Sequence, residues 1–216
     1  MDTSLNIPQE TPDIYNVQHN LANNTPTASE VGYLWSSYFA ETMAVCFLKY
    51  FLAKSKDPDI KPVFQYALDV SSQRVKTIEN IYNSLDHPIP EAFGEKDVDI
   101  NARELFSETY LLHYTRLTNK FILVNYCKAF SVASRKDIQN FFDECINTVR
   151  EVYRRTTDVL LAKGILLKSP KIPIPDRISY VHKENYYGSF LKKSDRPLNA
   201  LEVNYIYEII VSKMIL

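Results

Sequence analysis

The sequence predicts an all-α protein organised as a four-helix bundle, and three observations support this fold class. Residues 102–130 and 135–163 contain neither Pro nor Gly, so each stretch can form a helix of about eight turns. Only 4 Gly occur among 216 residues, which disfavours turn-rich β structure. Apolar residues recur at spacings of three and four, so each helix has an apolar stripe that other helices must cover.

The first helix is expected to begin after Thr27, where T-A-S-E forms a capping box with Glu30 as its third helical residue. It should end near Lys54. Asp57-Pro58 then has the form of a cap followed by a first-turn proline, so a second helix is expected to start there.

The segment DHPIPEAFGEKDVDI, residues 86–100, contains two prolines and a glycine and should connect the second and third helices. Extended, it can span roughly 45–50 Å, whereas a helix of the expected length is about 40 Å long. It can therefore carry the chain to the opposite end of the bundle. Short, long and short connections are the pattern of a ferritin-like bundle with one long crossover. A simple up-down-up-down bundle with a decorated loop is the alternative.

The third helix is expected from Asn101 onward, with Glu104 as the third residue of its cap. Ser134 and Asp137 resemble a capping box at the start of the fourth helix. Gly164 should end that helix. The bundle is therefore expected to occupy residues 27–164.

The segments outside the bundle have a different composition. Residues 1–26 are rich in Pro, Asn and Thr and are expected to form a flexible N-terminal arm. Residues 165–197 should form a Pro-rich linker strapped across the bundle. Its candidate anchors are Ile165, Leu166, Tyr186, Tyr187 and Phe190.

Residues 198–216 are predicted to form one extra C-terminal helix, and its start repeats the start of the first helix. Ala, Glu, Val and Tyr at positions 28, 30, 31 and 33 recur 172 residues later, with Asn199 in place of Thr27 as the cap. This indicates an internal repeat, so the segment is expected to be the truncated first helix of a second bundle. Chance similarity of two amphipathic helix starts is the alternative.

Four stretches of the chain carry a resemblance to a known family: PTASEVGYLW, PIPEAFGEKDVDINARELFSETYLL, SRKDIQNFFDEC and LLAKGILLKSPKIP. They resemble an uncharacterised ferritin-like family of spore-forming bacteria that is related to spore coat protein F. The resemblance covers about residues 26–182 and implies tandem four-helix bundles, a pattern from which this chain departs by ending near the first helix of the second bundle. It implies no activity.

The overall composition excludes several classes of protein. A formal net charge of −1 gives no electrostatic reason to expect nucleic acid as a partner. No apolar run is long enough to cross a bilayer, and no signal peptide is visible. The three cysteines are widely spaced within apolar helical patterns, which favours buried, reduced thiols. We therefore expect a cytoplasmic location, in the forespore or the spore if the resemblance holds.

The sequence does not predict a catalytic, cofactor or metal site. Ferritin-like di-iron bundles need Glu-x-x-His on two helices, but three residues before each histidine lie Asn16, Ser84, Tyr110 and Ser179. The alternative is a carboxylate-rich metal bundle that uses Glu41, Glu108 and Glu144.

Polar residues nevertheless interrupt the apolar stripes. The candidates for a buried polar core are Glu41, Arg74, Glu108 and Asn119. Because an unpaired buried carboxylate is costly, we hypothesise that Glu41 and Arg74 pair inside the bundle, in the space that a metal holds in iron-binding relatives. The alternative is that about half of these side chains reach solvent at the edge of a stripe.

The favoured function is therefore a non-catalytic structural or interaction role, connected with sporulation. The sequence leans against an enzyme but leaves that class open as an alternative. The C-terminal helix is the expected contact for a homo-oligomer or a protein partner, since a lone apolar helix needs a surface to bury its stripe.

Overall fold

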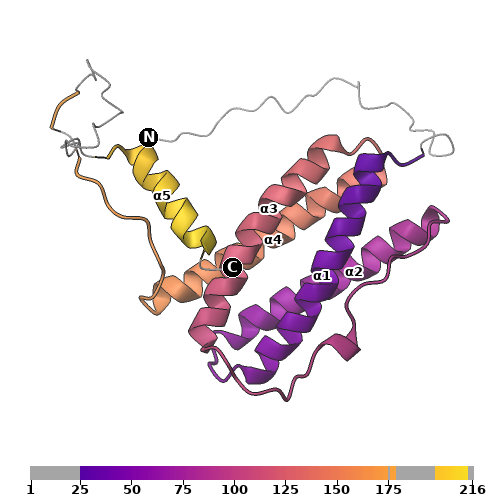
Figure 1. The fold of residues 1–216 in the computed structure, drawn as a ribbon, viewed down its shortest axis with the longest axis horizontal. Coiled ribbons are helices and arrows are strands. Elements are labelled where there is room, and N and C mark those ends of the chain that lie inside the picture. Colours follow the sequence, from indigo (N-terminus) through magenta and orange to yellow (C-terminus); the bar gives the residue numbers. More distant parts are fainter. Residues whose placement is uncertain (1–24, 175, 179–197, 214–216) are drawn as a thin grey trace, which may run out of the picture.

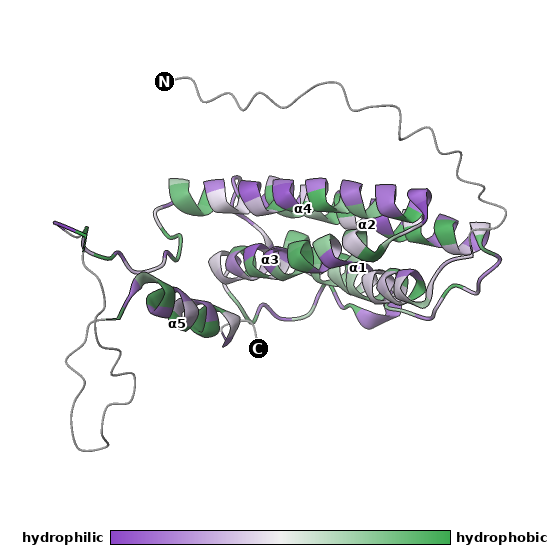
Figure 2. Cartoon of the chain, turned by 90° about the horizontal axis from the view of Figure 1, so that it is seen from above, coloured by the Kyte–Doolittle hydropathy of each residue, from purple (hydrophilic) through white to green (hydrophobic). Residues whose placement is uncertain are grey.

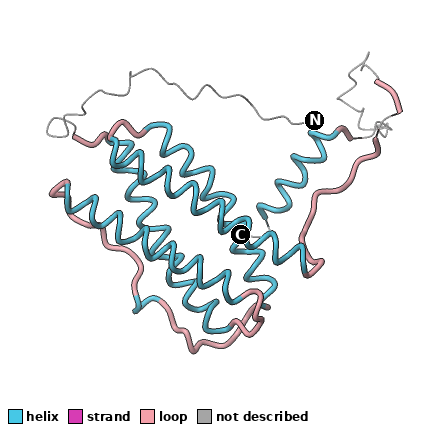
Figure 3. The backbone as a smooth tube through the Cα atoms, turned by 180° about the vertical axis from the view of Figure 1, so that it is seen from behind, coloured by secondary structure: helices cyan, strands magenta, loops and turns pink. Residues whose placement is uncertain are grey.

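The computed structural model describes residues 25–174, 176–178 and 198–213. These residues form five α-helices and one short 3-10 helix, η3 (Glu95–Asp97), and they contain no strand (Figure 3). The predicted all-α class is confirmed. Most of the predicted arm, residues 1–24, lies outside the described part of the chain, as do the linker anchors Tyr186, Tyr187 and Phe190. Among the described helices, none is long and apolar enough to span a bilayer.

The first hairpin consists of α1 (Ala28–Lys54) and α2 (Lys61–Ser84). The expected capping box is present, because Thr27 Oγ1 accepts the Glu30 N–H and Glu30 accepts the Thr27 N–H. The predicted cap at Asp57 is present, because its side chain accepts the Asp59 N–H at 2.9 Å and its carbonyl accepts the Lys61 N–H at 3.0 Å. Residues 58–60 form a turn, however, and the continuous helix α2 begins at Lys61, three residues later than predicted.

The connection from α2 to α3 is long and returns along α1 to the opposite end of the hairpin (Figure 1). It covers residues 85–107. The ring of Phe93 packs on Phe39 of α1, with the ring centroids 4.8 Å apart. Farther along, the Tyr50 hydroxyl of α1 donates to the Arg103 carbonyl at 2.9 Å. The short connections within each hairpin and the long one between them have the order that the sequence indicates.

The second hairpin consists of α3 (Glu108–Val132) and α4 (Lys136–Ala162). The predicted start of α3 near Asn101 is wrong, because Ser107 is the N-cap and its hydroxyl accepts the Tyr110 N–H at 3.2 Å. Glu104 consequently lies exposed in the crossover and caps no helix. At the end of α4, Gly164 adopts a φ of 70°, a left-handed conformation that ends helices and suits glycine.

The start of α4 uses a different cap from the one expected. Ser134 and Asp137 do not form a capping box. The Glu30 carboxylate of α1 instead accepts the N–H groups of Ser134 and Arg135, at 2.7 and 2.8 Å. Asp137 pairs with Arg135 at 2.8 Å. One buried carboxylate therefore caps the first helix of one hairpin and the second helix of the other.

The helices form two layers, with α1 and α3 in one and α2 and α4 in the other (Figure 2). Packing within each hairpin is more extensive than packing between the hairpins. The core has two apolar clusters, one around Leu34, Ile78 and Phe142 and the other around Leu48, Phe64 and Leu160. Polar side chains separate the two clusters at the middle of the bundle.

The fifth helix, α5 (Ala200–Lys213), lies outside the bundle and approaches α3 at its C-terminal end (Figure 1). Glu208 forms an ion pair with Lys120 of α3, and the Tyr207 hydroxyl donates to the Leu167 carbonyl at 3.1 Å. Val211 is the one buried residue described in α5. The described contacts of α5 are therefore one ion pair to α3, one hydrogen bond to the linker and one buried apolar side chain.

Candidate functional site

The middle of the bundle holds a buried polar cluster built from Glu41 of α1, Arg74 of α2 and Tyr126 of α3. Arg74 Nη1 lies 2.9 Å from Glu41 Oε1, and the side chains are 7% and 2% exposed. The Tyr126 hydroxyl donates to the same carboxylate oxygen. The structure thus places Glu41 and Arg74 together inside the bundle, as hypothesised, and adds a tyrosine that the sequence reasoning missed.

The guanidinium of Arg74 also contacts α4. Its Nη2 donates to Thr148 Oγ1 at 2.7 Å and lies 3.4 Å from the Cys145 carbonyl. Its Cζ atom lies 5.5 Å from the centroid of the Tyr126 ring, within reach of a cation–π contact. Arg74 Nε is buried and has no hydrogen-bond partner among the described residues. One arginine therefore connects all four helices of the bundle.

Electrostatics fix the protonation states of the cluster. Burial alone would lower the pKa of Arg74, but the Glu41 carboxylate raises it above its usual value. Burial, together with the nearby Glu41 charge, raises the pKa of Tyr126 well above 10.0. At neutral pH the cluster thus contains a cationic guanidinium and a neutral phenol that donates to the carboxylate.

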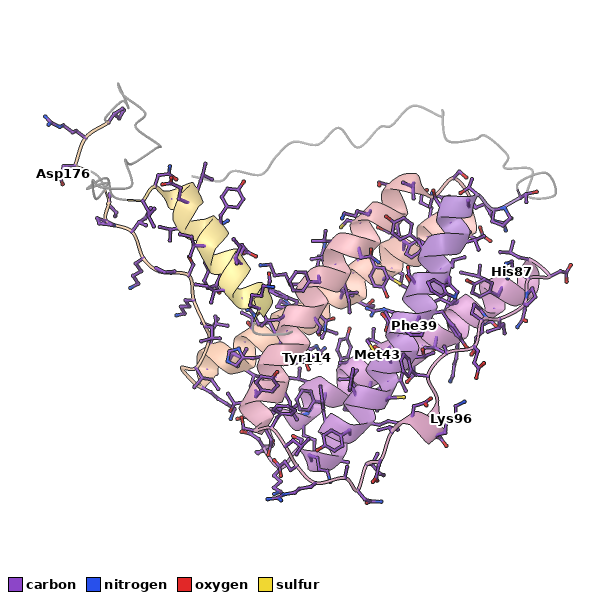
Figure 4. All side chains as sticks on the ribbon, in the orientation of Figure 1. Phe39, Met43, His87, Lys96, Tyr114 and Asp176 are labelled. Atoms are coloured by element: carbon purple, nitrogen blue, oxygen red, sulfur yellow. The ribbon has the colours of Figure 1, made fainter. Side chains whose placement is uncertain are left out.

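A cavity of about 240 Å³ opens beside the cluster, between α1 and α3. Glu41, Arg74 and Asn119 line its polar part. Met43 and Tyr114, labelled in Figure 4, line it from opposite helices. The cavity follows from the fold, because the two hairpins pack more tightly within themselves than against each other. The remaining lining residues are Ala40, Ala44, Phe47, Leu48, Phe51, Ala67, Ser71, Thr115, Thr118, Phe121, Ile122 and Val152.

The other predicted polar-core residues lie elsewhere or have local partners. Glu108 is half-buried at the start of α3, where it accepts the N–H groups of Lys56 and Asp57 at 2.9 and 3.0 Å. Burial raises its pKa, but these bonds outweigh burial and lower it. Asn119 is buried and donates to the Thr115 carbonyl of its own helix at 2.8 Å.

The three carboxylates of the metal alternative are not brought together. Glu41 is in the central cluster, Glu108 is at one end of the bundle, and Glu144 is exposed on α4. Across the described ranges, no three His, Cys, Asp or Glu side chains lie close enough to hold an ion together. His113 contacts the Ile165 carbonyl at 3.1 Å.

One of the three cysteine predictions is wrong. Cys46 and Cys145 are buried and reduced, as expected, but Cys127 is exposed. Cys127 directly follows Tyr126 in α3, and it is the tyrosine side chain that faces the core. The helical pattern alone could not decide between the neighbours, since both are apolar enough to face a core.

Two further residues of the cluster were missed, for different reasons. Tyr126 continues the row formed by Thr115, Asn119 and Ile122 at spacings of three and four, so its position could have been read from the stripe. Thr148 gave no comparable signal, because a threonine at the edge of a helix stripe can equally face solvent.

Comparison with known proteins places the chain in a family. Residues 17–178 match the family described as "Protein of unknown function (DUF3231)". The chain belongs to the DUF3231 family. This match covers the whole bundle and the first part of the linker. No curated protein matches the sequence.

A solved structure is similar to this DUF3231 chain in fold. It is the crystal structure of a putative spore coat protein from Bacillus halodurans C-125, with a TM-score of 0.63 and 16% sequence identity. The similarity covers 71% of this chain and 99% of the other. At this identity the comparison establishes a shared helical fold.

Proposed function

We propose that this chain is a non-catalytic structural protein with a ferritin-like bundle, associated with sporulation, in which α5 binds α5 of a second copy. The observation that carries the proposal is the outward face of α5. Six large apolar side chains, five in α5 and one two residues before it, are between 46% and 69% exposed: Leu198, Leu201, Tyr205, Ile206, Ile209 and Ile210. Contiguous apolar surface of this kind marks interaction sites in folded proteins.

The start of α5 supports an origin as a repeat of α1. Asn199 and Glu202 form a reciprocal pair of cap hydrogen bonds, each 2.9 Å long, as Thr27 and Glu30 do at α1. With the two starts aligned, Ile206 corresponds to Leu34, which is buried in the core. The exposed face of α5 is thus the counterpart of a face that packs against helices in α1.

A second copy of α5 fits this face in charge as well as in polarity. Glu202 and Lys213 lie on the apolar side of α5, about three helical turns apart and near its two ends. In an antiparallel pair, Glu202 of each copy would lie near Lys213 of the other. Opposite charges in these positions favour one orientation and register of paired helices.

The bundle topology and the comparisons support the remaining parts of the proposal. Two hairpins joined by a crossover that runs the length of the bundle are characteristic of ferritin-like folds. The similar Bacillus halodurans protein has a name that refers to the spore coat. A coat is an assembly, so a bundle with an outward apolar helix suits a part in it.

No observation favours the metal-binding alternative. The central carboxylate already has a guanidinium and a phenol as partners, and the other two candidate carboxylates lie apart from it. The Glu41–Arg74 pair supports a structural interior in which the charges balance each other.

The self-association is tested by analytical ultracentrifugation of the full chain. The wild type should sediment as a concentration-dependent dimer, and Ile209→Ser/Ile210→Ser should shift it to monomer. The matched control is Leu105→Ser/Ile174→Ser, which removes two side chains that are 75% and 92% exposed elsewhere on the surface. A wild type that stays monomeric at its highest soluble concentration would contradict the proposal.

The sporulation part is tested in the source bacterium by following the protein with an antibody. It should accumulate during sporulation and stay with purified spores. Equal amounts in growing cells and none in washed spores would refute this part and leave the association result unaffected.

A further inference from the structure

Two polar atoms in the lining of the cavity between α1 and α3 can be reached from its interior. Asn119 and Ser71 line the cavity and are 9% and 5% exposed. Asn119 Oδ1 and Ser71 Oγ have no hydrogen-bond partner among the described residues. The fully enclosed atoms without a partner in this part of the chain are Ser37 Oγ, Arg74 Nε and the Tyr82 hydroxyl. The Asn119 and Ser71 oxygens are not among them, so both are accessible from the cavity.

The Asn119 amide determines which polar group a ligand needs. Its Nδ2 donates to the Thr115 carbonyl at 2.8 Å, and because a carbonyl only accepts, the nitrogen must occupy that side of the amide. Oδ1 is therefore the amide atom left for the cavity, and an amide oxygen also only accepts. The Ser71 hydroxyl can donate or accept, so it does not select between ligands. A ligand that pairs with Asn119 must carry a hydrogen-bond donor.

The walls of the cavity are aromatic. Phe47 and Phe51 of α1 and Tyr114 and Phe121 of α3 contribute rings to the lining. Tyr114 already packs edge-on against both phenylalanines of α1, with centroids 6.1 and 6.0 Å apart. Edge-to-face and offset contacts of this kind favour an aromatic ligand. Phe47 and Phe121 are 41% and 46% exposed, so a ligand can enter between them.

The volume limits the size of the ligand. An apolar cavity of about 150 Å³ holds one benzene molecule. By the same proportion, the 240 Å³ here holds about ten non-hydrogen atoms. One aromatic ring with a hydroxyl group and a short alkyl chain has this size.

Charge limits the ligand further. Glu41 and Arg74 are the only charged residues in the cavity lining, and they neutralise each other. A bound anion or cation would leave a net charge in a poorly solvated space, which is costly. A neutral donor avoids that cost.

We propose that this cavity binds a neutral phenol or aryl alcohol of about ten non-hydrogen atoms, whose hydroxyl donates to Asn119 Oδ1. Its ring lies among the aromatic side chains of α1 and α3. The site is separate from the self-association through α5, because its lining residues all belong to α1–α4.

Two compounds of the same shape test the hydrogen bond. The first is para-propylphenol, which carries the donor, and the second is para-propyltoluene, which has a methyl group in its place. Isothermal titration calorimetry on the full chain gives the ratio of their affinities for the wild type and for Asn119→Leu, which removes the acceptor at nearly constant side-chain size. The ratio should shift about tenfold toward para-propyltoluene in the variant. An unchanged ratio in the folded variant, or no binding of para-propylphenol to the wild type, would overturn the proposal.

A third compound tests the charge. The anion para-ethylbenzoate is close in size to para-propylphenol and should bind at least about tenfold more weakly, because the lining offers it no compensating charge. Equal or tighter binding of the anion would contradict a neutral site.

Two further variants test the location. Ala44→Phe should fill the cavity and abolish binding of para-propylphenol, whereas Ala162→Phe, at an exposed position near the end of α4, should not. Unchanged binding by Ala44→Phe would place the site elsewhere and refute the proposal.

Discussion

Two helices of this chain, α1 and α5, begin with the same local signals and meet different surroundings. Each starts with a reciprocal cap between its N-cap residue and a glutamate three positions later. In α1 the following apolar side chains enter the core, and Leu34 is fully buried. In α5 the corresponding side chains face outward. Local sequence therefore determines that a helix forms, while the surrounding helices determine whether its stripe is buried.

The cap glutamates show the same difference. Glu30 also accepts N–H groups at the start of α4, and it is 1% exposed. Burial raises its pKa, but the backbone bonds from Arg135, Thr27 and Ser134 outweigh burial and lower it from 4.5 to about 2. A local cap has become a connection between the two hairpins.

The largest effect is expected at the buried charge of α1. Glu41→Ala should lower the free energy of unfolding by about 3–5 kcal/mol, because it leaves the Arg74 guanidinium buried without its carboxylate. The aligned position in α5 is the exposed Lys213, where Lys213→Ala should change the unfolding free energy by less than about 0.5 kcal/mol. Urea denaturation followed by circular dichroism measures both. Similar small losses would show that Glu41 is not a core residue.

The next effect concerns the apolar stripes. Leu34→Ala should lower the free energy of unfolding by about 3 kcal/mol, since it opens a cavity in a packed core. Ile206→Ala should lower the free energy of unfolding of the monomer by less than about 0.5 kcal/mol, because that side chain is largely in solvent. The same urea titrations, at low protein concentration, compare the two. An equal cost would mean that α5 is as deeply packed as α1.

The buried cap glutamate, Glu30, predicts that folding stability falls in acid. The folded pKa of Glu30 lies below the ordinary value, so its stabilisation is fully present above about pH 5 and is lost as the pH falls through about 2. Glu30→Gln should therefore lower the free energy of unfolding by about 2–3 kcal/mol at neutral pH. The unfolding free energy of this variant should also change less than that of the wild type between about pH 5 and about pH 2. Urea titration at each pH measures both profiles. A wild-type stability that does not fall in this range would contradict the role of Glu30.

The smallest effect concerns the charges at the ends of the α5 face. Lys213→Glu should weaken self-association by at most about 1 kcal/mol, since it places like charges opposite each other in the antiparallel pair. Glu202→Lys/Lys213→Glu should restore much of the loss. Sedimentation equilibrium measures the association constants. Failure of the exchange to restore association would argue against the antiparallel register.

Much of the fold followed from the sequence, because capping signals and helical stripes are local. Thr27, Lys54 and Gly164 mark helix ends that the structure retains. The errors at Glu104 and Ser134 share one cause: each has a side chain that could cap a helix locally, but in the fold Ser107 caps α3 and Glu30 caps α4. Contacts as distant as Glu30 to Ser134 decide between such alternatives.

The candidate site was accessible from sequence only in part. Glu41 and Arg74 were apparent because charged residues interrupt apolar stripes. The cavity was not apparent, since its existence depends on how closely α1 approaches α3. The unpaired Arg74 Nε likewise depends on the orientation of one guanidinium, which no sequence pattern specifies.

The most direct test of the account asks whether the outward face of α5 meets a second α5 in antiparallel register. In a Cys127→Ser background, Ile206→Cys and Ile209→Cys lie opposite each other across the pair, within disulfide reach. Mixing the two variants under mild oxidation should give cross-linked dimers faster than either variant alone, and Asn204→Cys on another side of α5 should give none. Equal cross-linking from Asn204→Cys, or none from the mixture, would contradict the account.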